Sequence, residues 1–118
     1  MANTKGWQTV VPRLFATDAK ALVSFIQEVF AAEGDYQQER PTELRIGDSM
    51  IMVSAAKARG NYPACLYVYV NNLETTFARA LTQNAVAIEK PLLTPYGDKR
   101  AAIKDSWGNM WQIAEHTG

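Results

Sequence analysis

The sequence predicts an α+β fold made of two consecutive β-α-β-β-β modules. Two stretches, 21–30 and 73–81, carry apolar residues three and four positions apart, which is the spacing of an amphipathic helix. Each follows a strand-like stretch and precedes several short stretches bounded by Gly, Asn or Asp. The same order of elements therefore occurs twice, as an internal repeat. A ferredoxin-like α+β domain, which also contains β-α-β units, is the alternative, but the turn signals recur at matching places in both halves.

The first module opens with an apolar strand at 9–16. Thr17 or Asp18 can cap the following helix, because either side chain can accept a hydrogen bond from an otherwise unpaired backbone N–H. Gly34 is expected to end this helix in the left-handed conformation. Three strands should follow, at 35–38, 42–46 and 50–54. A tight turn at Gly47-Asp48-Ser49 should join the last two.

The second module repeats this order, beginning with the alternating strand 64–70. Asn71 or Asn72 can cap its helix, and Asn84 can take the left-handed conformation at its end. Three more strands are expected at 85–89, 100–104 and 110–114. With a junction near 59–63, the sequence predicts a single domain, 1–118, with internal modules of roughly 7–58 and 63–116.

Composition excludes several functional classes. The 118 residues include 12 basic and 12 acidic side chains, scattered without a basic stripe, which argues against a nucleic acid partner. No apolar stretch is long enough to span a bilayer, and the start of the chain lacks the apolar core of a signal peptide. The single cysteine, Cys65, cannot form an internal disulfide. A cytoplasmic protein without membrane or nucleic acid partners is expected.

The most informative segment is 96–114. It contains Tyr96-Gly97-Asp98-Lys99-Arg100, then Asp105-Ser106-Trp107-Gly108-Asn109 as a reversing turn, then an alternating strand. This segment resembles the C-terminal hairpin of the vicinal oxygen chelate superfamily, which includes glyoxalase I, bleomycin-resistance proteins and extradiol dioxygenases. It departs from the usual Y-G-D-R and D-P patterns at Lys99 and Ser106. The resemblance implies two curled mixed sheets around a concave cup, with the helices on the convex side and ligands in the cup.

The resemblance also implies four metal-ligand positions, which here are Val11, Met52, Cys65 and Gln112. Metal-binding members commonly have His or Gln, Glu, His and Glu at these places. Valine cannot ligate, and a thioether is a poor ligand for the divalent ions of such sites. Cys65 and Gln112 alone offer two weak ligands, and the only histidine, His116, is expected in an exposed tail. No metal and no cofactor are therefore expected.

Period-two alternation assigns side chains to the cup. The predicted lining is largely aromatic and sulfur-containing with a few polar groups, as in a small-molecule pocket. Met50 and Met52 could equally fill a closed core. Lys99 or Arg100 could bind an anionic ligand group, or could pair with Asp98 at the surface. The predicted ligand-binding residues, including Trp107 from the turn, are Arg13, Phe15, Met50, Met52, Ser54, Cys65, Tyr67, Tyr69, Trp107 and Gln112.

These observations favour a metal-free protein that binds a small, partly aromatic organic molecule, as drug-sequestering relatives do. The rival is a glyoxalase- or dioxygenase-like enzyme, a lyase or isomerase with a degenerate site. It would use Cys65 and Gln112 with outside ligands, or acid–base chemistry by Tyr67 or Tyr69. A homodimer is also expected, because open strand edges and surplus aromatic residues favour association. Those aromatic residues are Trp7, Tyr62, Tyr96 and Trp107.

Overall fold

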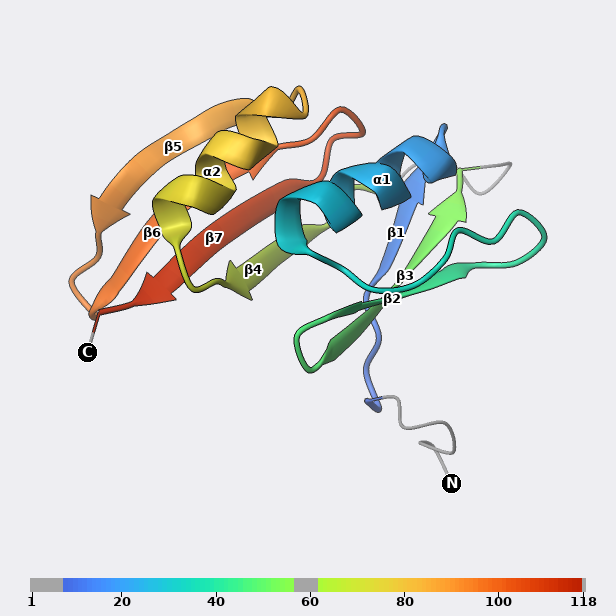
Figure 1. The fold of residues 1–118 in the computed structure, drawn as a ribbon, viewed down its shortest axis with the longest axis horizontal. Coiled ribbons are helices and arrows are strands. Elements are labelled where there is room, and N and C mark those ends of the chain that lie inside the picture. The colour runs from blue at the N-terminus through green and yellow to red at the C-terminus, as the bar shows by residue number, and fades with distance from the viewer. Residues whose placement is uncertain (1–7, 57–61, 118) are drawn as a thin grey trace. The chain divides into compact units, whose positions relative to one another are not determined.

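The computed structural model describes residues 8–56 and 62–117 (Figure 1). These residues form an α+β fold with two open mixed sheets, as predicted. The chain divides into two compact units, Met1–Tyr62 and Pro63–Gly118. Neither helix is long and apolar enough to cross a membrane within the described chain. The elements are β1 (Arg13–Ala16), α1 (Ala19–Phe30), β2 (Thr42–Ile46), β3 (Ser49–Ala55), β4 (Cys65–Tyr69), α2 (Leu73–Thr82), β5 (Val86–Leu93), β6 (Asp98–Lys104) and β7 (Met110–His116).

The first unit is a three-stranded sheet covered on one face by α1 (Figure 1). Its strand order is β1-β3-β2, with β1 parallel and β2 antiparallel to β3. Helix α1 packs against β1 and β3. Burial of aliphatic side chains from both layers stabilises the unit. The fully buried ones include Leu14, Leu22, Ile26, Val29, Leu44 and Val53.

The ends of α1 show which local signals act. The Asp18 carboxylate accepts a hydrogen bond from the Ala21 N–H at 3.1 Å and is the N-cap. The helix ends at Phe30, and Ala31 takes the left-handed conformation with φ 55° and ψ 38°. The prediction that Gly34 ends the helix was therefore wrong. Gly34 has φ 134°, and a Cβ there would overlap the carbonyl oxygen of Glu43, so the glycine permits a close approach of two backbone segments.

The predicted strand at 35–38 is not formed, so the first module lacks one of its expected strands. Only an isolated bridge between Glu33 and Arg45 joins this connection to β2, with N···O distances of 2.9 and 2.8 Å. Residues 35–40 are all exposed and mostly polar. They have no apolar alternation to bury against α1, so extended pairing would gain little. The opening strand also starts later than expected, at Arg13 rather than Thr9.

The second unit is a four-stranded sheet with the order β4-β7-β6-β5. β4 runs parallel to β7, and the remaining pairs are antiparallel. Helix α2 packs against β5, β6 and β7 (Figure 1). Asn72 is its N-cap, accepting from the Thr75 N–H at 3.0 Å, and Asn84 has φ 72° just after it, as predicted. The buried core includes Leu73, Ala80, Ala101, Ile103, Trp111 and Ile113.

All three C-terminal strands extend further than expected. β5 continues to Leu93 and accommodates Pro91 because it is an edge strand with irregular register. β6 begins at Asp98 rather than Arg100, and β7 continues to His116 rather than Ala114. Asp98 and His116 are paired at the end of this ladder. The extension places both residues in the sheet, where they form part of the candidate site.

The turn between β6 and β7 is held by one buried carboxylate. Asp105 Oδ1 accepts from the backbone N–H groups of Trp107 and Asn109 at 2.9 and 3.0 Å. Asp105 Oδ2 accepts from Asn109 Nδ2 at 3.0 Å and from Trp111 Nε1 at 2.9 Å. Asn109 Oδ1 in turn accepts from the Ala64 N–H at 2.9 Å, just before β4. This Asp105 network links the turn, the core tryptophan and the start of β4.

Replacing Asp105 by alanine should destabilise the protein strongly. Asp105 is 5% exposed, and its loss leaves several buried donors without their carboxylate acceptor. Each such donor costs roughly 1–3 kcal/mol, so a total loss of about 3 kcal/mol or more is expected from urea unfolding. Asp48→Ala in the exposed turn between β2 and β3 is the matched control, with an expected change within about 0.5 kcal/mol. Equal losses for the two variants would contradict the role given to Asp105.

Candidate functional site

The face of the second sheet opposite α2 carries a hollow of about 440 Å³. Tyr67 and Tyr69 come from β4, which pairs with β7 so that Tyr69 lies beside Ala114. Ala114 lies beside Arg100 of β6, and its small side chain is fully buried. The tyrosine side chains therefore reach across β7 toward β6. The hollow is lined by Tyr67, Tyr69, Tyr96, Gly97, Asp98, His116 and Thr117.

Asp98 organises this hollow. Its Oδ2 accepts hydrogen bonds from the Tyr67 hydroxyl at 2.8 Å and the Tyr69 hydroxyl at 3.0 Å. Its Oδ1 lies 3.1 Å from His116 Nδ1. The residue is only 4% exposed although it borders the hollow. Thr94 holds the Asp98 backbone from the preceding turn, since its hydroxyl donates to the Asp98 carbonyl at 2.9 Å and accepts from the Asp98 N–H at 3.1 Å.

The rings around Asp98 pack on one another. Tyr69 and His116 are stacked, with centroids 4.2 Å apart and an interplanar angle of 18°. Tyr67 meets Tyr69 edge to face, with centroids 5.4 Å apart at 68°. Such contacts favour one arrangement of the rings. His116 is exposed, as expected, but it ends β7 and contacts Tyr69 and Asp98 instead of lying in a tail.

The electrostatics keep the two tyrosines as neutral donors. Burial raises the pKa of Tyr67 far above its ordinary value, and hydrogen bonds to Tyr96 and Asp98 add to this shift. The hydrogen bond to Asp98 raises the pKa of Tyr69. Burial alone would raise the pKa of Asp98, but hydrogen bonds from Tyr67 and Tyr69 and the nearby His116 lower it overall. Asp98 is therefore an ionised acceptor bound by neutral hydroxyl donors.

Neither Lys99 nor Arg100 pairs with Asp98. Arg100 binds Glu89 through Nε and Nη2, at 2.8 and 3.1 Å, and donates from Nη1 to the Tyr96 hydroxyl at 2.9 Å. Lys99 Nζ lies 2.7 Å from a carboxylate oxygen of Glu74, on α2. The expected surface pairing of Asp98 with Lys99 or Arg100 is therefore wrong, because each cation is engaged by a glutamate instead. The hydrogen bond with Tyr67 lowers the pKa of Tyr96 the most. Burial opposes this effect, and the hydrogen bond with Arg100 lowers the pKa further.

The other predicted residues of this unit lie nearby but outside the hollow. Cys65 and Gln112 share the open face of the sheet, with Cys65 Sγ 3.9 Å from Gln112 Oε1. Trp107 is half-buried in the β6–β7 turn, where its backbone N–H donates a hydrogen bond to Asp105 Oδ1. None of the three lines the hollow. The sequence predicted Tyr67 and Tyr69 as ligand-binding residues but did not predict Asp98, which is the hydrogen-bond acceptor that they share.

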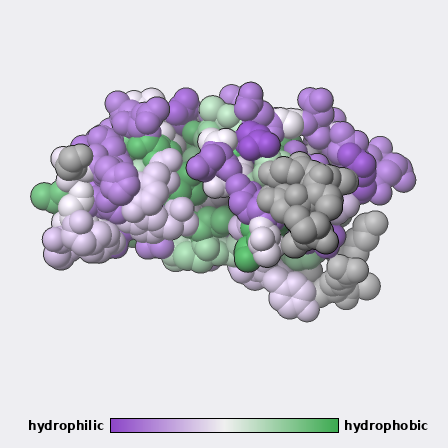
Figure 2. Space-filling view, turned by 90° about the horizontal axis from the view of Figure 1, so that it is seen from below, coloured by the Kyte–Doolittle hydropathy of each residue, from purple (hydrophilic) through white to green (hydrophobic). Residues whose placement is uncertain are grey.

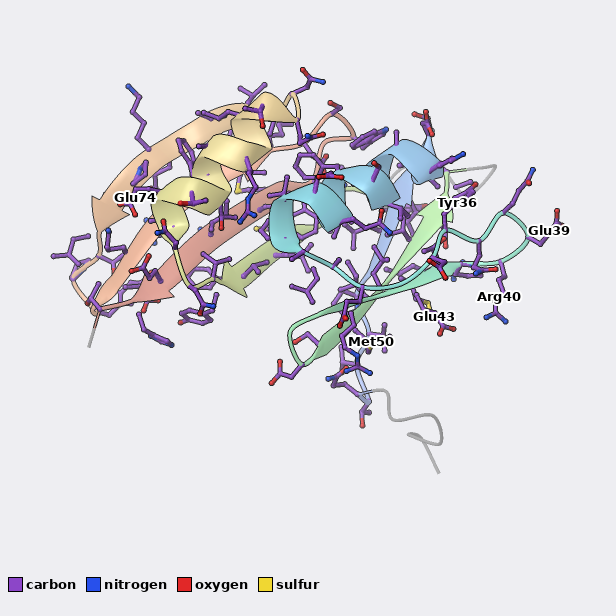
Figure 3. All side chains as sticks on the ribbon, in the orientation of Figure 1. Tyr36, Glu39, Arg40, Glu43, Met50 and Glu74 are labelled. Atoms are coloured by element: carbon purple, nitrogen blue, oxygen red, sulfur yellow. The ribbon has the colours of Figure 1, made fainter. Side chains whose placement is uncertain are left out.

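The predicted residues of the first unit share one face of its sheet. Arg13 lies beside Met52 and Phe15 beside Ser54 across the β1–β3 pair, and Met50 lies beside Arg45 of β2. A separate cavity of about 260 Å³ includes Arg13, Phe15 and Ser54 together with residues 36–41 of the α1–β2 connection. Met50 and Met52 are half-buried and do not line it. Figure 3 shows Tyr36, Glu39 and Arg40 on this connection.

Comparison with solved structures relates this arrangement to known proteins. The chain matches TioX from Micromonospora sp. ML1 with a TM-score of 0.77 and 22% identity, over 91% of this chain and 97% of TioX. It matches a glyoxalase/bleomycin resistance protein/dioxygenase family enzyme from Burkholderia phytofirmans PsJN with a TM-score of 0.74 and 21% identity, over 88% and 94%. The fold is that of the glyoxalase/bleomycin-resistance proteins. A glyoxalase-related enzyme from Fulvimarina pelagi matches with a TM-score of 0.74 and 16% identity, over 92% and 88%.

The glyoxalase-like likeness rests on structure alone. No protein-family model matches the sequence, and no curated protein matches it significantly. In the described residues, no three His, Cys, Asp or Glu side chains are grouped so that they could hold a metal ion. Within the second unit, the two metal-ligand positions implied by the sequence resemblance are Cys65 and Gln112, which provide one thiol and one amide oxygen. This donor pair fits a divalent ion poorly.

Asp98→Asn should change the pH dependence of stability. A carboxyl with a lowered pKa in the folded state adds stability above its unfolded pKa of about 3.9, and that stability is lost as pH falls through the lower folded pKa. Asp98→Asn should therefore unfold at a lower temperature than the native protein at pH 7, and this difference should shrink below about pH 4. Thermal unfolding followed by circular dichroism from about pH 3 to pH 7 measures both curves.

Asp48→Asn, in an exposed turn, is the control and should follow the native curve throughout. A difference between Asp98→Asn and the native protein that is the same at every pH would contradict the assignment of an ionised Asp98.

Proposed function

We propose that this chain is a small-molecule-binding protein that holds a partly aromatic organic ligand without a bound metal. The observation that carries the proposal is the 440 Å³ hollow of the second unit, where three tyrosines and an imidazole surround a nearly buried carboxylate. Pockets for small molecules commonly have this size, with mostly apolar or aromatic walls and a few orienting polar groups. The fold shared with glyoxalase/bleomycin-resistance proteins supports the proposal, although a fold alone does not determine function.

The hollow is prepared for a planar ligand. Tyr67, Tyr69 and Tyr96 are 38%, 52% and 63% exposed, so much of their ring surface is open to solvent. Aromatic rings gain free energy when they are removed from water and stacked. Hydrogen bonds to Asp98 hold Tyr67 and Tyr69 in place before a ligand arrives. A wall that is already ordered loses less entropy on binding, which favours affinity.

The raised pKa values of Tyr67 and Tyr69 favour binding over general-base catalysis at this site. A general base must be deprotonated near the working pH. The pKa values of Tyr67 and Tyr69 are raised instead, by burial for the first and by the Asp98 hydrogen bond for the second. Both hydroxyls therefore serve better as fixed hydrogen-bond donors than as bases. Sequestration of a drug-like molecule is one function that such a site can perform without chemistry.

Tyr67→Ala should weaken ligand binding. The change removes ring area and one hydroxyl from the hollow, so the affinity of a ligand found by thermal-shift screening of aromatic drugs and metabolites should fall by roughly 1–3 kcal/mol. Isothermal titration calorimetry measures the difference. Tyr67→Phe keeps the ring and should retain most of the affinity, which separates the two contributions.

Val68→Ala is the matched control, because Val68 is the next residue of β4, is half-buried and points to the face of the sheet opposite Tyr67 and Tyr69. It should reduce the free energy of unfolding by about 1 kcal/mol and leave the affinity unchanged. Unchanged affinity in Tyr67→Ala together with a loss in Val68→Ala would show that the ligand does not occupy the hollow.

A homodimer remains part of the proposal. β5 is an edge strand whose aliphatic side chains Val86, Ile88 and Leu93 are 61%, 50% and 69% exposed, and exposed edges of this kind favour association. Figure 2 shows apolar side chains exposed among hydrophilic ones on one face.

Light scattering should give the mass of two chains, and Ile88→Lys should shift the mass toward one chain. Val10→Lys, another exposed position, should not; a native protein of single-chain mass at high micromolar concentration rules out the dimer.

A further inference from the structure

The first unit contains a second candidate binding site, centred on the guanidinium of Arg13. Arg13 opens β1 on the face away from α1 and lines the 260 Å³ cavity. Its Nε donates to Ser54 Oγ at 3.0 Å, across the parallel β1–β3 pair. Its guanidinium carbon lies 5.3 Å from the centroid of the Phe15 ring on the same strand. These two contacts hold the side chain along the strand instead of leaving it free in solvent.

The remaining donors of Arg13 are available to a ligand. Within the described residues, the hydrogen bonds and ion pairs of Arg13 include none from Nη1 or Nη2. This differs from Arg100, whose guanidinium is engaged by Glu89 and Tyr96. A guanidinium with a fixed Nε and two open Nη groups presents a planar set of donors that matches a carboxylate.

The surroundings of Arg13 also favour an anion with an apolar body. Ala19, the first residue of α1, lines the cavity, and the first turn of α1 contains no acidic residue. The N-terminus of a helix favours negative charge, although the Asp18 carboxylate already caps it. Arg40 and Glu39 of the α1–β2 connection also line the cavity and offset each other. Phe15, Tyr36, Pro41 and Val53 supply its apolar and aromatic wall.

We propose that this cavity binds the carboxylate of a small aromatic acid. The carboxylate would accept hydrogen bonds from Arg13 Nη1 and Nη2, and the ring would lie against the apolar wall that includes Phe15 and Tyr36. Glu43 lies on the same face, but Met52 separates it from Arg13 in the strand register and no ion pair joins them. An aromatic acid fits better than inorganic phosphate, because phosphate has no apolar part to place against this wall.

All residues that line this cavity belong to the first unit, and sodium benzoate is a suitable probe for it. Titration of the ¹⁵N-labelled full chain with benzoate, followed by NMR, should give saturable shift changes at the Arg13 Nε–Hε group and at the backbone amides of β1 and β3. Arg13→Gln should weaken benzoate binding at least tenfold. Ser54→Ala should weaken it several-fold, because the guanidinium loses the partner that fixes it.

Arg45→Gln is the matched control, since Arg45 is another arginine of this sheet that does not line the cavity. It should bind benzoate like the native protein, as should Tyr67→Ala in the other unit. The spectra themselves show whether each variant is folded. Benzamide, which lacks the charge, and sodium phosphate, which lacks the ring, should each bind at least tenfold more weakly than benzoate.

Several results would overturn the proposal. Native-like benzoate binding by Arg13→Gln would remove Arg13 from the site, and equal losses in Arg13→Gln and Arg45→Gln would indicate only a general effect of charge. Phosphate binding as tight as benzoate would show an unspecific anion site. Loss of benzoate binding in Tyr67→Ala would place the probe in the second-unit hollow, which would support the function proposed for that hollow and not this one.

Discussion

The candidate site of the second unit depends on the Asp105 network. This carboxylate closes the turn between β6 and β7 and, through Trp111 Nε1 and Asn109, links that turn to the core and to the start of β4. The turn sets the β6–β7 register, in which Lys104 pairs with Met110 at one end and Asp98 with His116 at the other. A slip of one residue would turn one partner of that pair to the helix-covered face. The turn lies at the opposite end of the hairpin from Asp98 and His116, but the register that it sets determines whether the site forms.

The two buried aspartates of this hairpin show how environment separates a structural role from a binding role. The hydrogen bonds to Asp105 come from backbone, amide and indole N–H groups of its own turn and of the start of β7, so its partners are nearby in the chain. Asp98 is bound by hydroxyl and imidazole groups from β4 and β7, and these groups line a hollow open to solvent. Satisfying a buried carboxylate stabilises the fold in both cases. Only the donors around Asp98 also offer ring surface to a ligand.

The two units differ in whether the cations near their candidate sites have carboxylate partners. In the second unit, Arg100 is neutralised by Glu89 and Lys99 is held by Glu74 of α2, so Asp98 is the charge at the centre of the hollow. In the first unit, Arg13 contacts a neutral hydroxyl and an aromatic ring, and no carboxylate among the described residues pairs with it. A hydroxyl orients a guanidinium without cancelling its charge. The hollow of the second unit thus contains the Asp98 carboxylate, whereas the cavity of the first unit contains the Arg13 guanidinium.

The sequence by itself determined the features that depend on neighbouring residues. Alternation and helical spacing predicted the α+β fold and the faces of β1, β3, β4 and β7. Residue types narrowed each helix cap to two neighbours, of which Asp18 and Asn72 are the N-caps, and predicted the left-handed Asn84. The hairpin motif predicted the fold that the solved structures confirm. Only the tertiary structure decided that 35–38 forms no strand, that Ala31 rather than Gly34 ends α1, and that Asp98 and His116 join Tyr67 and Tyr69. These outcomes depend on strand register and on contacts between residues distant in the chain, which a local pattern does not contain.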